Sequence, residues 1–490
     1  MKYVFNHFYK LRHDRYRTIL MASSFNNLNV DVDVEWVSII HPIYAMILSF
    51  FSRPITLDIA VYRIKTFLSI DENHAQDLVC KLVCNRDRFH VKYKGFISNF
   101  PKNLIIEESG LNQKIKDYNP TMFKYDKIDC NSIRLFEAPL DITFMLNNVC
   151  VTNCIYCYAN KTHKCTMMDF SYIKEIIREA YNLKIRNIIV DGGEFFIYPF
   201  WREFLKELKS YDYVPNLVST KYSLTENEIK DFSVYNIPLQ ISIDSFNSDI
   251  LTKMVGYIPN YAGRMLDSLR AVDEVLSFQI ATILTRHNGS IENLEDMLEH
   301  IKKFKRIKQW EIRVAFKSLY THQDFRDIQL ERSCIDKIQE WVEKTKSEVP
   351  FELSFSRGRE SNFFKSKNGS KDFIGSRCSA NSIHMFVLPD GQVSICEQLY
   401  WNKDFLIGDL KKQSIKEIWN SPRALFLANM SRKDYSEGSV CKKCELFETC
   451  SSYMNRCYTN ILKVYGEDHW DYPDPRCYYA PRDISDSIYV

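Results

Sequence analysis

Three cysteines lie close together in the stretch LNNVCVTNCIYCY, residues 146–158. They are Cys150, Cys154 and Cys157, separated by three residues and then by two. The chain has 15 cysteines in 490 residues, and at that density this spacing is expected by chance only about 0.01 times. An apolar run at Ile142–Leu146, typical of a buried strand, comes just before the triplet. We therefore interpret the three cysteines as one site at the end of a strand.

Three thiolates at this spacing suit an iron–sulfur cubane. They would bind three irons and leave the fourth iron open. An open iron can chelate the amino and carboxylate groups of a methionine moiety, and a reduced cluster can then cleave the S–C5′ bond to give a 5′-deoxyadenosyl radical. A three-ligand zinc site is the alternative interpretation.

Strands and helices alternate through the region of the triplet. We expect strands at Ile142–Leu146, Asn187–Val190, Pro215–Ser219, Leu239–Ile243, Gln279–Leu284 and Glu311–Phe316. We expect helices at Ser171–Asn182, Trp201–Lys209, Glu226–Phe232, Tyr261–Leu276 and Ile291–Phe304. This alternation favours parallel βαβ units, and six units favour a partial (β/α)6 TIM-like barrel over a closed barrel of eight. The triplet would then lie at the carboxyl edge of the strands, where such barrels place active sites.

A second group of cysteines lies toward the C-terminus. Its members are Cys378, Cys396, Cys441, Cys444, Cys450, Cys457 and Cys477. Asp390-Gly391 lies between the apolar runs 385–388 and 393–395, which predicts a hairpin. Such a hairpin would bring Cys378 and Cys396 together. Because four thiolates that begin with a CxxC pair also suit structural zinc, a zinc site is the alternative here too.

The residues around the triplet resemble the radical SAM superfamily, whose members use S-adenosylmethionine (SAM), over roughly Asp141 to Phe316. The family signature is CxxxCxxC with an aromatic residue before the third cysteine, and Tyr156 fills that place. The resemblance implies that Cys150, Cys154 and Cys157 hold a [4Fe–4S] cluster to which SAM binds.

Two downstream motifs extend this resemblance. After the second expected strand, Gly192, Gly193 and Glu194 resemble the GGE motif, which receives the amino group of SAM. Glycines allow the backbone to approach a ligand, and a carboxylate suits an ammonium group. After the fourth expected strand, Ser242 and Asp244 resemble the SxD motif that approaches the SAM ribose.

One position departs from the family pattern. The third expected strand ends in Thr220-Lys221, where relatives often read TNG. The resemblance therefore assigns no role to either residue. Asn288 follows the fifth strand, where relatives often carry an asparagine near SAM, and an ordinary loop asparagine is the alternative.

The C-terminal cysteines resemble the SPASM extension of peptide-modifying radical SAM enzymes. The resemblance implies one or two auxiliary iron–sulfur clusters that could accept an electron from the substrate or bind a thiolate. The first would use Cys378, Cys396 and Cys457, and the second would use Cys441, Cys444, Cys450 and Cys477. Six residues rather than three separate Cys450 from Cys457, and Met454 occupies the usual place. With three thiolates, the first cluster would have a position open to a substrate thiolate or to a non-cysteine ligand.

The first 108 residues predict a winged-helix-like module. Two short strands are expected within Tyr3–Met21, helices at Leu57–Leu68 and Asp71–Cys84, and a small hairpin at Phe89–Ile97. The module resembles the leader-peptide recognition elements of ribosomal-peptide (RiPP) maturases, in which an extended leader pairs with a sheet edge. The expected edge is the Tyr3–Met21 strand pair.

The bulk composition excludes several classes of protein. The net charge is only +3, which gives no case for nucleic-acid binding. We expect no secretory signal, because charged residues interrupt the first 20 positions, and no membrane span, because the most apolar stretch is too short. Cysteines in such a chain point to the reducing cytoplasm and to metal sites rather than disulfides.

These observations predict a leader-binding domain (1–108), a linker (109–138), a radical SAM partial barrel (139–320) and a SPASM domain (321–490). The expected function is maturation of a leader-bearing precursor peptide by a radical SAM oxidoreductase that forms an oxidative thioether or C–C cross-link. Flavodoxin or ferredoxin would donate the electron. The alternatives are sulfatase-maturase-like oxidation of a protein side chain and a non-catalytic, zinc-containing peptide-binding protein.

Overall fold

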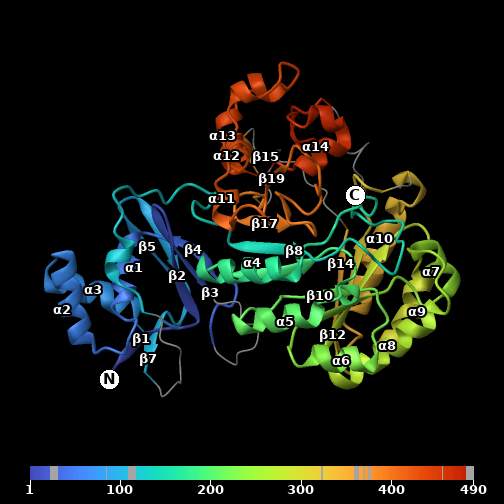
Figure 1. Ribbon diagram of the computed structural model, residues 1–490, viewed down its shortest axis with the longest axis horizontal. Helices are drawn as coiled ribbons and strands as arrows, with labels where there is room; N and C mark the ends of the chain where they lie inside the picture. The colour runs from blue at the N-terminus through green and yellow to red at the C-terminus, as the bar shows by residue number, and fades with distance from the viewer. Residues whose placement is uncertain are drawn as a thin grey trace. The chain divides into compact units, whose positions relative to one another are not determined.

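The computed structural model describes residues 1–22, 31–83, 85–108, 117–321, 324–357, 364–367, 370–373, 377–454 and 456–481. Figure 1 shows its helices and strands. The chain divides into two compact units. Unit 1 comprises Met1–Leu140, Ala180–Asn187 and Asp212–Val214, and unit 2 comprises Asp141–Glu179, Ile188–Tyr211 and Pro215–Val490.

Unit 1 contains a three-stranded antiparallel sheet, two strand pairs and three helices. The sheet has the order β2 (Tyr9–Asp14), β3 (Arg17–Ala22), β4 (Val37–Ile40). The antiparallel pairs are β1 (Tyr3–Phe5) with β7 (Ile105–Glu107), and β5 (Phe89–Tyr93) with β6 (Phe96–Phe100). The helices are α1 (Pro42–Ser49), α2 (Leu57–Leu68) and α3 (Glu72–Leu82). The helices α2 and α3 and the β5–β6 hairpin lie in the expected order, while Cys84, at the expected end of α3, lies outside the described residues.

Local chemistry explains the boundaries of α3 and of the hairpin. The side chain of Asp71 accepts a 2.9 Å hydrogen bond from the backbone amide of His74 and so caps the start of α3. Lys94 and Gly95 both have positive φ, 47° and 81°. That is the requirement of a tight hairpin turn, so these two residues set the register of β5 against β6.

The segment 117–138 packs within unit 1, although we expected a linker over 109–138. Tyr118, Phe123 and Leu135 are buried in this unit. Residues 109–116 lie outside the described part of the chain. Polar composition suggested a linker, but the buried apolar residues of the segment contribute to a hydrophobic core.

A fully buried ion pair between Asp14 and Arg17 fastens this segment to the β2–β3 hairpin. The guanidinium of Arg17 lies 2.9 Å from the carboxylate of Asp14 and donates to the carbonyl oxygens of Ser132 and Arg134. The carboxylate of Asp14 also accepts the backbone amide of Phe136 at 2.8 Å. Each buried charge therefore has hydrogen-bonding partners, which buried charges require.

One sheet of unit 2 is entirely parallel. Its order is β10 (Val218–Thr220), β11 (Leu239–Ser242), β12 (Phe278–Leu284), β13 (Ile307–Val314), β14 (Glu352–Ser356). The helices that accompany it are α6 (Glu226–Ser233), α7 (Ser248–Val255), α8 (Tyr261–Val275), α9 (Ile291–Ile301) and α10 (Arg332–Thr345). Figure 1 shows α6 to α9 along the outside of this sheet. The βα pattern is the expected one, but α10 and β14 extend it beyond the boundary that we placed at Tyr320, and α7 was not expected.

The other five-stranded sheet of unit 2 joins two distant parts of the chain. Its order is β19 (Leu406–Asp409), β18 (Gln392–Ser394), β17 (His384–Val387), β8 (Asp141–Met145), β9 (Asn187–Asp191). Strand β17 runs parallel to β8 and antiparallel to β18. The expected hairpin at Asp390-Gly391 is therefore confirmed, and its first strand pairs with the strand that precedes the cysteine triplet.

The remaining elements of unit 2 are mostly helical. Helices α4 (Phe170–Asn182) and α5 (Trp201–Ser210) follow β8 and β9 in the chain. The C-terminal elements are β15 (Phe364–Lys367), β16 (Ser370–Phe373), α11 (Ile415–Trp419), α12 (Pro422–Ala428), α13 (Phe447–Tyr453) and α14 (Tyr458–Tyr465). Among the described residues, no helix combines the length and the apolar character that crossing a membrane requires.

We predict that Arg17→Met lowers the free energy of unfolding by about 3–5 kcal/mol, because it leaves the carboxylate of Asp14 buried without its partner. Chemical denaturation of the full chain measures this change. Arg15→Met is the matched control, because Arg15 is exposed and lies 3.5 Å from Glu137, where an ion pair contributes little. Equal stability of the two variants would contradict the role given to the buried pair.

Candidate functional site

The cysteine triplet lies on the loop after β8, and this loop is hydrogen-bonded to the Gly192-Gly193-Glu194 loop after β9. The backbone amide of Gly193 donates to the carbonyl oxygen of Asn147 at 2.8 Å, and that of Glu194 donates to the carbonyl oxygen of Val149 at 2.7 Å. The side chain of Asn147 bridges the loops, because its Nδ2 donates to the carbonyl of Glu194 at 3.0 Å and its Oδ1 accepts the amide of Val149 at 2.9 Å. The path of the chain into Cys150 is thus set by the loop after β9.

The two glycines allow this close approach. Gly192 has a φ of +117°, and a Cβ atom there would lie 2.4 Å from Cγ of Met145. A Cβ atom at Gly193 would lie 2.3 Å from the carbonyl oxygen of Val149 and 2.4 Å from Oδ1 of Asn147. All three distances are far below contact, so a side chain at either glycine would clash with β8 or with the triplet loop.

The three thiols of the triplet interact electrostatically. Burial raises the pKa of Cys150 to about 12, and Glu194, Cys157 and Cys154 add to this effect. Each of the three cysteines is partly buried. No three Cys, His, Asp or Glu side chains in the described ranges are close enough together to bind a single metal ion.

The carboxylate of Glu194 is held by the end of β10. It is 3% exposed. The hydroxyl of Thr220 donates to Oε1 at 2.7 Å, and the backbone amide of Lys221 donates to Oε2 at 2.9 Å. Burial raises the pKa of Glu194, and these hydrogen bonds oppose the increase. Thr220 and Lys221, to which the resemblance assigned no role, thus orient the carboxylate of the GGE motif.

Asp244 faces the protein interior. It is fully buried, and its Oδ2 accepts the hydroxyl of Tyr156 at 2.6 Å and Nζ of Lys221 at 2.8 Å. Its Oδ1 accepts the backbone amide of Ile283 at 3.0 Å. Ser242 is only partly buried, and its hydroxyl lies 3.3 Å from Oγ of Ser219. Of the two SxD residues, Ser242 is therefore the better placed to meet a ligand.

Asn288 is part of the support for this region. It is 1% exposed, and its Nδ2 donates to the carbonyl oxygens of Asp244 at 3.0 Å and Ile283 at 2.9 Å. These bonds favour the ordinary loop role over direct contact with SAM.

The C-terminal cysteines gather into two sets. Burial raises the pKa of Cys378 to about 11, and the charge of Cys457 raises it further. Burial and the charges of these two thiols also raise the pKa of Cys396. Burial raises the pKa of Cys450 to about 12, and its neighbouring thiols are Cys477, Cys441 and Cys444. The assignment of these interacting thiols to two auxiliary clusters, which the resemblance implies, stays a prediction.

A cluster of tyrosines and carboxylates lies near both groups of cysteines. The hydroxyl of Tyr158 donates to Asp191 at 3.2 Å, and Asp191, burial and Glu397 together raise the pKa of Tyr158. Besides burial, the charge of Glu397 raises the pKa of Cys396. Burial and the charges of Tyr158 and Cys157 raise the pKa of Tyr400. One signal was available in the sequence, since Tyr158 and Glu397 each directly follow a candidate cysteine ligand.

Family models match two parts of the chain. The model of the radical SAM superfamily matches residues 145–308. The model of the SPASM iron–sulfur cluster-binding domain matches residues 378–445. These ranges contain the cysteine triplet and the first four cysteines of the C-terminal group.

Individual proteins show the same similarity. The antilisterial bacteriocin subtilosin biosynthesis protein AlbA of Bacillus subtilis (strain 168) is 21% identical over 331 residues, which is 67% of this chain and 69% of AlbA. Streptococcus suis SuiB bound to its precursor peptide SuiA is 15% identical, with a TM-score of 0.64 over 97% of this chain and 99% of SuiB. SuiB bound to S-adenosylmethionine is 14% identical, with a TM-score of 0.63 over 97% of this chain and 100% of SuiB. At these identities the structural similarity establishes a shared fold.

We predict that Gly193→Ala lowers the iron and sulfide bound per chain after anaerobic reconstitution, because the added methyl group pushes the triplet loop away from its position. Gly95→Ala is the control: it places the same methyl group at a positive φ of 81°, where no atom lies within 4 Å. If Gly193→Ala bound as much iron and sulfide as the unmodified chain, the close approach of the two loops would not be needed for the site.

Proposed function

This chain belongs to the radical SAM enzymes that carry a SPASM domain, and we propose that it forms an oxidative cross-link in a ribosomally made precursor peptide. The observation that carries the proposal is the triplet of thiols on a loop hydrogen-bonded to the loop that carries Glu194, together with two further sets of thiols in the SPASM region. The first arrangement suits SAM chemistry, and the second suits auxiliary clusters.

The radical SAM domain binds a [4Fe–4S] cluster and SAM, and the SPASM domain binds auxiliary iron–sulfur clusters. When bound, the first cluster and SAM supply a 5′-deoxyadenosyl radical that abstracts hydrogen from the substrate. We assign Cys150, Cys154 and Cys157 to that cluster. Glu194, oriented by Thr220 and Lys221, is suited to accept the amino group of SAM.

We assign the two C-terminal sets to separate auxiliary clusters. Cys441, Cys444, Cys450 and Cys477 provide four thiolates, and the electrostatic contact of Cys450 with the other three supports a common site. Cys378, Cys396 and Cys457 provide three. Since iron–sulfur clusters are held by thiolates, both sets fit the group they would bind.

We propose a precursor peptide as the substrate because of what the similar proteins do. AlbA is a biosynthesis protein of the bacteriocin subtilosin, and SuiB forms a complex with its precursor peptide SuiA. We propose that the reaction takes place in the cytoplasm, with flavodoxin or ferredoxin as electron donor. Sulfatase-maturase-like oxidation and a zinc-containing binding protein are not favoured by these similarities.

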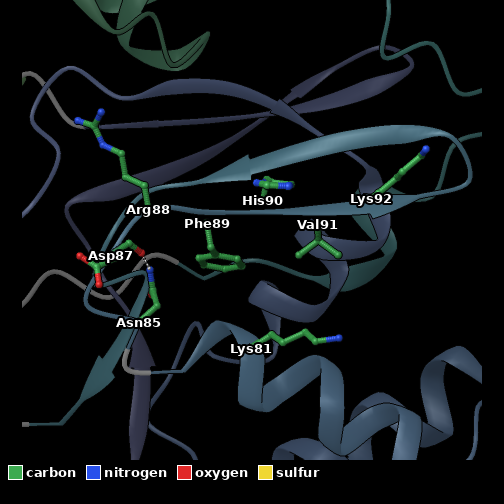
Figure 2. Close-up of a pocket in the computed structure, with 8 residues that line it drawn as sticks. All are labelled: Lys81, Asn85, Asp87, Arg88, Phe89, His90, Val91 and Lys92. Atoms are coloured by element: carbon green, nitrogen blue, oxygen red, sulfur yellow. Dashed lines mark hydrogen bonds between the residues drawn. The ribbon is translucent and has the colours of Figure 1, made fainter.

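The leader of the precursor would bind beside β5 in unit 1. A pocket of about 550 Å³ lies there, and Figure 2 shows α3 on one side of it and β5 on the other. Its lining residues are Lys81, Asn85, Asp87, Arg88, Phe89, His90, Val91 and Lys92. Within the described ranges, β5 pairs with β6 alone, so its outer edge can accept an extended peptide.

The edge that we expected from the sequence is already occupied. The backbone amide of Leu11 in β2 donates to the hydroxyl of Tyr118 at 3.0 Å, and its carbonyl oxygen accepts Nζ of Lys184 at 3.2 Å. Tyr118 and Lys184 thus already bind the backbone groups of Leu11 with which a leader strand would pair. The outer edge of β5 is the better candidate.

The side chains of β5 indicate what kind of leader fits. Phe89 and Val91 point toward α3, while Lys92 and, just before the strand, Arg88 extend from its other side (Figure 2), where the guanidinium of Arg88 also lies 2.7 Å from the carboxylate of Asp33. A strand added to this edge would present alternate side chains to these two faces. We therefore propose a leader segment in which apolar and acidic residues alternate.

We predict that the reconstituted protein, given SAM and dithionite, produces 5′-deoxyadenosine and that Cys150→Ala abolishes this product. Cys334→Ala is the control, because this cysteine lies on α10 away from both groups of cysteines in the sequence. With a candidate precursor peptide, mass spectrometry should show a loss of about two hydrogens per cross-link. Bound zinc without labile sulfide would contradict the proposal.

We also predict that Arg88→Glu combined with Lys92→Glu weakens the binding of a fluorescent peptide of alternating leucine and glutamate by roughly tenfold, about 1.4 kcal/mol. Fluorescence anisotropy measures this, and the affinity should fall as salt rises. The control is Arg53→Glu, a reversal at an exposed residue of unit 1 that is absent from the pocket lining. Unchanged binding by the double variant would place the leader elsewhere.

A further inference from the structure

Three side chains form a continuous chain of polar contacts that ends on the loop of the cysteine triplet. Nζ of Lys221 lies 2.8 Å from Oδ2 of Asp244, and the hydroxyl of Tyr156 donates to the same oxygen at 2.6 Å. Tyr156 lies between Cys154 and Cys157 in the sequence. We call Lys221, Asp244 and Tyr156 the relay.

Tertiary structure alone brings the relay together. Tyr156 belongs to the triplet loop, Lys221 follows β10, and Asp244 follows β11. The parallel register of β10 and β11 sets Lys221 and Asp244 at the same edge of the sheet. The ammonium of Lys221 also lies 5.7 Å from the centre of the Tyr156 ring, which adds a favourable cation–π contact.

Burial makes the charges of the relay effective. The side chain of Lys221 is only 14% exposed, and that of Asp244 is not exposed. In such surroundings a charge acts more strongly on its neighbours than it would in water. Cys154 and Cys157 are among the groups that interact with Lys221. Tyr156 and Asp244 occupy family motif positions, whereas Lys221 departs from the TNG pattern, so Lys221 is the relay residue for which the resemblance does not account.

We propose that the relay sets the reduction potential of the cluster assigned to the triplet, through the opposed charges of Lys221 and Asp244. The inference rests on the proposed assignment of Cys154 and Cys157 as cluster ligands. Reduction adds one electron, supplied by a low-potential donor of the flavodoxin or ferredoxin class, and no bond forms or breaks in this step. The added negative charge is stabilised by a nearby cation and destabilised by a nearby carboxylate.

For each relay residue we predict the direction in which a substitution shifts the midpoint potential. Lys221→Met removes a positive charge and should lower the midpoint potential. Tyr156→Phe removes the hydrogen bond that partly offsets the negative charge of Asp244 and should lower the potential as well, while the ring remains to pack. Asp244→Asn removes the negative charge that offsets Lys221 and should raise the potential. The potential should therefore shift in opposite directions in the Lys221 and Asp244 variants. General loosening of the site would shift it in the same direction in both.

The experiment is a redox titration of the reconstituted full chain without SAM, followed by electron paramagnetic resonance of the reduced cluster. To isolate this cluster, all variants are made in a chain in which Cys378, Cys396, Cys441, Cys444, Cys450, Cys457 and Cys477 are replaced by alanine. The expected change for Lys221→Met is a roughly tenfold lower ratio of reduced to oxidised cluster at a fixed potential, which corresponds to about 59 mV for one electron. Lys206→Met, an exposed lysine on α5, is the control and should leave the potential unchanged.

The outcomes separate this inference from the proposed function. Iron, sulfide and the absorption of a cubane are measured first in the background chain. If no cubane forms in the unmodified full-length protein, the cluster assignment fails. If the background chain does not retain its cluster, the same titration is done on the full-length variants with their auxiliary clusters present. If cubanes form and the potentials of Lys221→Met and Asp244→Asn both equal that of Lys206→Met, or shift in the same direction, the relay does not set the potential.

Discussion

The site depends on two loops that approach so closely that neither Gly192 nor Gly193 can carry a side chain. Backbone hydrogen bonds from the second loop fix the chain just before Cys150. The same second loop carries Glu194 into contact with the end of β10. The position of the thiols and the orientation of the carboxylate are therefore consequences of one backbone contact between the ends of adjacent strands.

Beyond this contact, buried charged side chains rather than apolar ones hold the strand ends of the site together. Asp244 follows β11 and joins it to the two neighbouring strands. Its carboxylate accepts hydrogen bonds from the ammonium of Lys221, after β10, and from the backbone amide of Ile283, in β12. Such groups do not add much stability relative to apolar residues, but they favour one arrangement over others, since any displacement leaves a charge unpaired. In unit 1, Asp14 and Arg17 have a similar position between the hairpin and the segment 117–138.

The sequence predicted what depends on short-range pattern. The cysteine spacing, the βα alternation and the hairpin at Asp390-Gly391 all have local signals, and their elements lie within a few residues of the expected bounds. The sequence did not predict what depends on distant partners. Nothing in the Thr220-Lys221 dipeptide indicates that it holds Glu194 and Asp244. The polar segment 117–138 looked like a linker because the charged residues that bind its backbone lie more than 100 positions earlier.

The pairing of β17 with β8 has a consequence for how this enzyme can be divided. The family models match two separate regions of the sequence. In the structure, however, β17 of the C-terminal region pairs with β8 and so extends the sheet that β8 and β9 form. Removing the C-terminal region would uncover a strand edge buried on both of its faces, and such an edge invites association with other chains. Exchange of this region between related enzymes would therefore succeed only if the incoming segment brings its own complementary strand.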